Sequence, residues 1–135
     1  MKNGAKLFYA IGFVFNVLSI IIIAVLLGIF GFSYSQPGLL EQVATEIGVT
    51  TEFIKEAILA FIILLAIGIV IELIITFVVV WARRNLIKNT GRVSPHVILL
   101  ILGIVGLNIF YLLGGIFGMT AASNDSEDED IDNEQ

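Results

Sequence analysis

The sequence predicts an all-α, polytopic membrane protein with three transmembrane helices in a compact bundle plus one short interfacial helix. Hydrophobic residues make up 58% of the chain and charged residues 14%, whereas soluble domains are about 45–50% apolar. Three apolar runs, at residues 7–32, 57–82 and 97–122, each exceed the roughly 20 residues that a helix needs to cross a bilayer. We therefore expect residues 1–122 to form one three-span membrane domain.

The first run follows two basic residues, Lys2 and Lys6. It is longer than the apolar core of a signal peptide, which is roughly 7–15 residues. No cleavage pattern of small residues follows it at positions 32–37. The sequence thus predicts a first transmembrane helix that is retained and that also directs insertion.

The loop at residues 33–56 contains a short helical pattern that begins after Pro37 and ends at Gly48. Its apolar positions share one side of the helix: Leu39, Leu40, Val43 and Ile47. We expect an amphipathic helix on the outer leaflet, and a partner-binding surface is the alternative. Thr50 or Thr51 is then placed to cap the second transmembrane helix.

Basic residues near the helix ends predict the orientation. Six lie at the N-terminus or in the loop 83–96, whereas the loop 33–56 holds one, Lys55. Because basic loops stay in the cytoplasm, the N-terminus and the loop 83–96 are expected there. We expect the four basic side chains of this loop either to set the topology or to contact lipid headgroups. They are Arg83, Arg84, Lys88 and Arg92. His96, at the end of the loop, is expected at the membrane interface.

The third run leads to the tail 123–135, which carries seven acidic residues and no aromatic residue. This composition predicts disorder, and three spans would leave the tail outside the cell. The run is also rich in glycine, so a re-entrant hairpin that turns after Asn108 is an alternative. In that case the tail would be cytoplasmic.

Each run has one strongly polar residue near its middle: Asn16, Glu72 and Asn108. Counted from the cytoplasmic ends at about 1.5 Å per residue, their depths are about 14, 15 and 17 Å. We expect them to meet inside the bundle together with Tyr111. No basic residue lies within the three runs, so the neutral carboxylic acid is expected at Glu72.

Two interpretations of this polar cluster remain open: it stabilises the bundle, or it is a proton or cation site. Small residues beside the polar ones are typical of close helix packing in lipid. The GxxxG spacing of Gly114 and Gly118 fits either self-association or an internal contact. The glycines expected at helix contacts are Gly12, Gly68, Gly114, Gly115 and Gly118.

The layout of spans and loops, with the ending Leu107-Asn108-Ile109-Phe110-Tyr111-Leu112-Leu113-Gly114-Gly115-Ile116-Phe117-Gly118, resembles a group of small membrane proteins. These come from Gram-positive bacteria and are catalogued as a domain of unknown function. The resemblance implies a multi-pass protein of a bacterial plasma membrane, and it implies no catalytic residues.

The sequence predicts that the protein is not an enzyme. It has no cysteine and a single histidine, and it offers no nucleophile paired with a base, no metal cluster and no phosphate-binding loop. We expect no cofactor and no nucleic-acid partner. The partners expected are the lipid bilayer and either another membrane protein or further copies of the chain. An accessory, envelope-stress or immunity-type role is favoured, and a small oligomeric proton or cation transporter or channel using Glu72 is the alternative.

Overall fold

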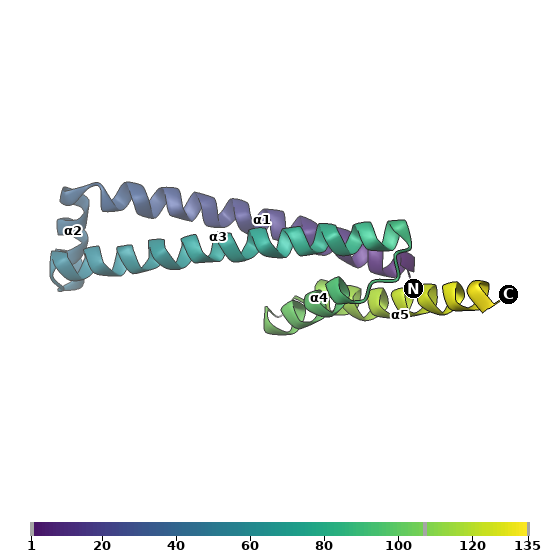
Figure 1. Ribbon diagram of the computed structural model, residues 1–135. Helices are drawn as coiled ribbons and strands as arrows, with labels where there is room; N and C mark the ends of the chain where they lie inside the picture. Colours follow the sequence, from purple (N-terminus) through teal and green to yellow (C-terminus); the bar gives the residue numbers. More distant parts are fainter. Residues whose placement is uncertain (1, 107, 135) are drawn as a thin grey trace. The chain divides into compact units, whose positions relative to one another are not determined.

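The computed structural model describes residues 2–106 and 108–134. The regular secondary structure of these residues is helical and comprises five α-helices (Figure 1), which confirms the all-α class. The chain divides into two compact units, residues 1–17 with 73–135, and residues 18–72. Because the unit boundaries fall within α1 and α3, each unit contains part of both helices.

The two long helices are α1 (Lys2–Tyr34) and α3 (Thr51–Lys88), with 33 and 38 residues. Both are long and apolar enough to cross a membrane. Their large apolar side chains point outward, as at Ile22 and Leu64, which are 59% and 63% exposed. Such outward-facing apolar surfaces are typical of helices whose solvent is lipid. The first two predicted spans are therefore present as membrane-compatible helices.

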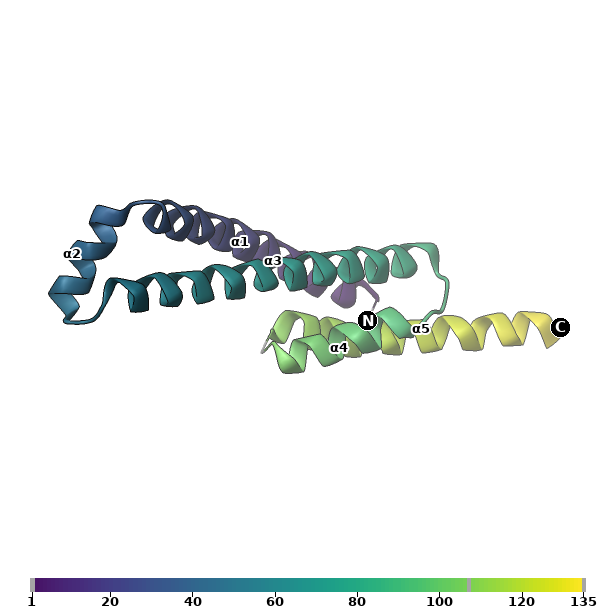
Figure 2. The same cartoon turned by 60° about the vertical axis from the view of Figure 1, so that its left-hand side comes forward.

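Helix α2 (Pro37–Ile47) connects them, as the sequence predicts (Figure 2). Pro37 occupies the first turn, where its missing N–H costs nothing. Gly48 ends the helix in the left-handed conformation, with φ of 79°, and its N–H donates to the carbonyl of Ala44. Thr50 caps α3, since its Oγ1 accepts from the Phe53 N–H at 3.2 Å. These local signals lie within the second unit.

The prediction of a third transmembrane helix is wrong. Residues 97–122 fall in two helices, α4 (Ser94–Val105) and α5 (Ile109–Glu134), which lie side by side and antiparallel (Figures 1 and 2). Helix α4 has 12 residues, and at about 1.5 Å per residue it is too short for a core of about 30 Å. The structure has a helical hairpin here, which is the chain path of the re-entrant alternative.

Glycine explains why this run folds back. A Cβ on Gly103 would lie 2.6 Å from the backbone nitrogen of Leu112, and one on Gly115 would lie 2.9 Å from the Cβ of Leu100. Only glycine allows the two backbones to approach so closely. Each of the two helices supplies one such contact point to the hairpin.

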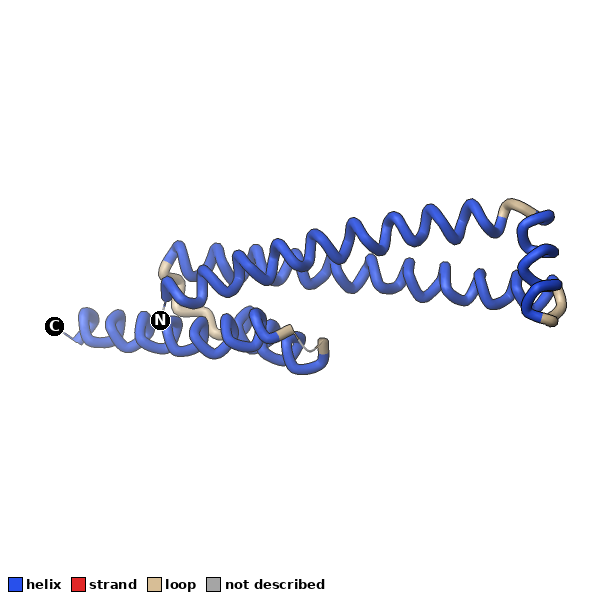
Figure 3. The backbone as a smooth tube through the Cα atoms, turned by 180° about the vertical axis from the view of Figure 1, so that it is seen from behind, coloured by secondary structure: helices blue, strands red, loops and turns tan. Residues whose placement is uncertain are grey.

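Helix α5 continues to Glu134, although the composition of residues 123–135 predicts disorder. No glycine or proline follows Gly118, and a helix that is already formed adds residues at little cost. Within α5 the Thr120 hydroxyl donates to the Ile116 carbonyl at 3.0 Å. Figure 3 shows the helical segments and the short connections between them.

The core of the first unit combines the N-terminal half of α1, the C-terminal half of α3, and the α4–α5 hairpin. Its buried residues are Ala5, Tyr9, Val78, Val79, Ala82, Leu86, Leu99, Tyr111 and Ala121. In the second unit, Leu40 and Ala44 of α2 are buried, and the rings of Phe30 and Phe61 stack with centroids 5.6 Å apart.

Candidate functional site

Polar side chains pair between α1 and α3 in both units. In the first unit the buried Asn16 donates from Nδ2 to the Thr76 hydroxyl. In the second unit the Ser19 hydroxyl donates to Glu72 Oε1 at 3.2 Å. Glu72 is half-buried. The polar residues that the sequence placed in the first two runs thus form hydrogen bonds within the chain.

Asn108 does not lie at the middle of a span, because the run bends there. Its Oδ1 accepts from the backbone N–H groups of Phe110 and Tyr111, at 3.1 and 3.4 Å. This is the geometry of a helix N-cap. The expectation that Asn108 meets Glu72 in a mid-membrane layer assumed a straight third helix, and the asparagine instead begins α5.

Tyr111 joins the hairpin to α1. It is 2% exposed, and its hydroxyl donates to the backbone carbonyl of Gly12 at 2.9 Å. A Cβ on Gly12 would lie 2.5 Å from Cε1 of Tyr111. Gly12 is therefore required for this ring to pack against the helix backbone.

A second buried pair, Tyr9 and His96, joins α1 to α4. The Tyr9 hydroxyl and His96 Nδ1 are hydrogen-bonded at 2.7 Å, and their rings are nearly parallel at 3°. Their exposed fractions are 0% and 1%. The sequence placed His96 at the level of the membrane interface, and the structure adds that its side chain is buried within the chain. The two rings are buried because Gly114 and Gly118 leave room for them. A Cβ on Gly118 would lie only 2.8 Å from the Tyr9 hydroxyl.

Desolvation by burial lowers the pKa of His96 from 6.5 to about 4. The imidazole is therefore neutral at pH 7. Its Nε2 has no hydrogen-bond partner in the described part of the chain. A neutral, enclosed imidazole held by one tyrosine is a packing element rather than an exposed proton donor.

The other glycines expected at helix contacts have distinct neighbours. A Cβ on Gly114 would lie 2.6 Å from Tyr9 Cε1, so this position has no room for a side chain. Gly68 is looser, since a Cβ there would meet Ile23 Cδ1 at an ordinary 3.7 Å. The GxxxG pair of Gly114 and Gly118 lies against side chains of the same molecule.

The N-terminus and the beginning of the acidic segment are linked. Lys2 Nζ forms an ion pair with Asp125 at 2.8 Å, and it also donates to the Asn89 side chain. These residues belong to α1, to the connection after α3, and to α5. Three spans would have put Lys2 and Asp125 on opposite sides of a bilayer, whereas the hairpin brings them together.

The basic residues Arg83, Arg84 and Lys88 lie in the last turns of α3, and Arg92 lies in the connection to α4. All four are exposed. None of them forms an ion pair with a described carboxylate. Among the described side chains, no group of three or more His, Asp and Glu residues is placed to hold a metal ion.

Sequence reasoning missed Asn85, which is 8% exposed and whose Nδ2 has no partner among the described residues. A signal was present, because Val78, Ala82 and Asn85 recur at helical spacing and share one side of α3. No comparable signal exists for the pairing of Tyr9 with His96, which are 87 positions apart.

Comparison with known proteins gives no relative: no family model, curated protein or solved structure matches this chain.

Proposed function

We propose that the protein is an integral membrane protein in which α1 and α3 cross the bilayer and the α4–α5 hairpin enters it without crossing. The outward-facing apolar surfaces of α1 and α3 support insertion. The ion pair of Lys2 with Asp125 supports placing both ends on one side. The excess of basic residues near Lys2 and Arg84 favours the cytoplasmic side, in the plasma membrane of a bacterium.

We propose that it acts without catalysis, through lateral contacts with another membrane protein, as an accessory, envelope-stress or immunity-type protein. The observation that carries this proposal is the surface around Gly28 and Gly31 of α1. A Cβ on either glycine would meet nothing within 4 Å, and Ala24 is exposed on the preceding turn. Each glycine costs a helix about 0.5–1 kcal/mol relative to alanine, which close approach of a second helix can offset.

The hydrogen bonds of the polar residues support a structural role for them. Asn16 pairs with Thr76 and Ser19 with Glu72, so each pair connects α1 to α3 within its own unit. In hydrocarbon such bonds contribute about 0.6 kcal/mol on average. They serve to hold a two-helix hairpin whose outer surface is left for partners.

The experiment is affinity purification of the tagged full chain from native membranes, with partner identity and stoichiometry read by mass spectrometry. Gly28→Leu adds bulk to the exposed small-residue surface, whereas Leu26→Phe adds bulk about 160° away on the same helix. We expect a stoichiometric partner that is lost with Gly28→Leu and retained with Leu26→Phe. Capture of only the chain itself, unaffected by Gly28→Leu, would contradict the proposal.

A second candidate function is proton or cation transport by an oligomer that uses Glu72. One observation favours it, namely a half-buried carboxyl group on an apolar helix. The test measures ion flux into vesicles that contain the purified protein, with Glu72→Gln as the variant that keeps the shape but cannot titrate. Flux above that of empty vesicles, abolished by Glu72→Gln, would favour transport. A protein that acts only through lateral contacts should produce no such flux.

A further inference from the structure

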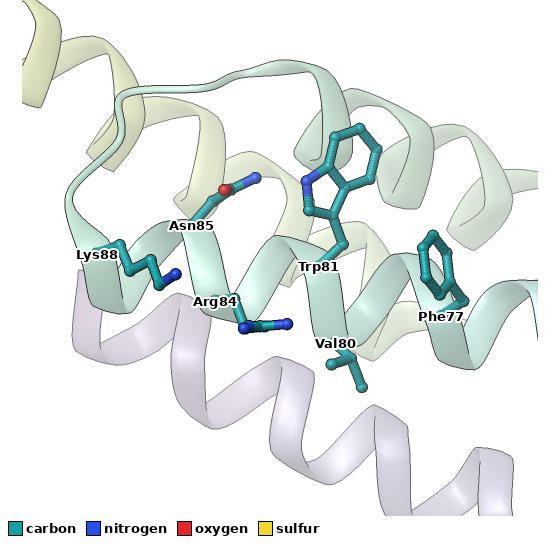
Figure 4. A pocket seen from close by; sticks show the side chains of 6 residues that line it. All are labelled: Phe77, Val80, Trp81, Arg84, Asn85 and Lys88. Carbon is teal, nitrogen blue, oxygen red and sulfur yellow. The ribbon is translucent and has the colours of Figure 1, made fainter.

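The C-terminal part of α3 carries a groove of about 300 Å³ in the first unit. Its lining residues follow one another at helical spacing along a single side of the helix (Figure 4). They are Phe77, Val80, Trp81, Arg84, Asn85 and Lys88.

The two ends of this groove differ in chemistry. Phe77 and Val80 form an apolar end, and they are 71% and 43% exposed. Arg84 and Lys88 form a cationic end, one and two turns further along the helix (Figure 4). An occupant that fits both ends has an apolar chain joined to an anionic group.

The polar end lacks partners within the described chain. Arg84 and Lys88 form no ion pair with a described carboxylate, and the Nδ2 of the buried Asn85 has no acceptor there. An anionic occupant with acceptor oxygens would pair with the two cations, which are both exposed.

The position of the groove identifies the source of that occupant. Phe77 and Val80 belong to the apolar run 57–82, so their exposed surface continues the face that meets lipid chains. Trp81 lies between the two ends, and tryptophan is enriched where lipid chains give way to headgroups. A phospholipid in the adjacent leaflet would place its chain and its phosphate at these two levels.

We infer that this groove binds one anionic phospholipid, with the phosphate at Arg84 and Lys88 and an acyl chain along Phe77 and Val80. The inference rests on the proposal that α3 crosses the bilayer. It goes beyond that proposal, because basic residues that only set topology would attract anionic lipid to a similar extent at every position, whereas a site in the groove depends on Arg84 and Lys88. Each basic residue near an anionic surface contributes about a fivefold preference.

Trp81 is the only tryptophan in the chain, so its fluorescence reports on the groove alone. The full chain is reconstituted in vesicles of phosphatidylcholine with a small, fixed fraction of phosphatidylglycerol. In one preparation the phosphatidylglycerol carries brominated chains, which quench tryptophan on contact. In the other, an equal amount of phosphatidylcholine is brominated instead. The ratio of the two quenching efficiencies measures which lipid occupies the groove.

We expect brominated phosphatidylglycerol to quench Trp81 several-fold more strongly than the same amount of brominated phosphatidylcholine. The double variant Arg84→Gln, Lys88→Gln should bring the ratio close to one. The matched control, Arg83→Gln with Arg92→Gln, removes the same charge outside the groove and should keep most of the preference. Circular dichroism verifies that both variants retain their helices.

Equal quenching by the two lipids would overturn the inference, as would an equal loss of preference in the control variant. Failure of membrane insertion is distinguishable from failure of the site. If α3 were outside the bilayer, neither brominated lipid would quench Trp81. If α3 were inside but the groove unselective, both would quench it alike.

Discussion

At the residue scale, the glycines divide into two kinds. Gly12, Gly114 and Gly118 lie directly against tyrosine or histidine rings, where a Cβ would clash. Gly28 and Gly31 face open space. The first kind is required by packing within the chain. The second kind has no such requirement, and it is the reason that we place a partner helix there.

This difference predicts opposite effects of one substitution. Gly118→Ala should lower the free energy of unfolding by about 1–3 kcal/mol, since the new methyl group overlaps the Tyr9–His96 pair. Gly28→Ala should raise it by about 0.5–1 kcal/mol through helix propensity. Titration of the purified protein from mild detergent into a denaturing detergent measures both. A loss at Gly28 as large as that at Gly118 would contradict this assignment.

At the element scale, the break between α4 and α5 decides the architecture of the C-terminal half. The Asn108 side chain caps α5, and the Asn108 N–H donates to the Gly103 carbonyl at 2.9 Å. The Gly106 N–H donates to the Leu102 carbonyl at 2.8 Å. The N–H groups of Gly106 and Asn108 are thus both satisfied by carbonyl groups of α4.

The cap predicts a specific pattern of substitutions at Asn108. Asn108→Ala should cost about 1 kcal/mol of stability, because two N–H groups of α5 lose their acceptor. Asn108→Ser should retain most of the stability, since serine caps helices nearly as well. The same denaturing titration measures both variants. Equal losses for alanine and serine would mean that the amide acts elsewhere and that Asn108 is not a cap.

The local elements were predictable because their signals are local. Pro37, Gly48 and Thr50 mark helix ends through backbone conformation and a neighbouring N–H, so the sequence predicts α2 and the start of α3. A break in the third run was only one of two alternatives, with the turn expected after Asn108, because hydropathy measures the length of an apolar run and not its packing. The close contacts of Gly103 and Gly115, which favour the hairpin over a straight helix, exist only when α4 and α5 are packed together.

The candidate site was predictable in part for the same reason. Hydropathy and spacing identify Asn16 as a polar residue in an apolar helix, so a hydrogen bond within the chain was predictable, whereas its partner Thr76 lies 60 positions away. The burial of Tyr9 and His96 depends on contacts between distant segments. The groove was missed because the sequence assigned Arg84 and Lys88 to topology or to lipid headgroups and gave no reason to connect them with Phe77.

At the scale of the whole molecule, the α4–α5 hairpin determines on which side of the membrane the C-terminal segment is proposed to lie. With α1 and α3 as the spans, the connection 35–50 lies on one side of the membrane. Lys2, the loop after α3 and the beginning of the acidic segment then share the other side, in agreement with the Lys2–Asp125 ion pair. This arrangement is the central claim, since the partner surface and the lipid groove are both defined relative to it.

The most direct test is labelling of single cysteines with a membrane-impermeant maleimide in intact cells. The chain has no cysteine, so Asn3→Cys, Ser35→Cys and Ser123→Cys each give a unique label site. We predict that only Ser35→Cys is labelled from outside, and that Asn3→Cys and Ser123→Cys react only after permeabilisation. Labelling of Ser123→Cys from outside, together with Ser35→Cys, would mean a third crossing and would contradict the account.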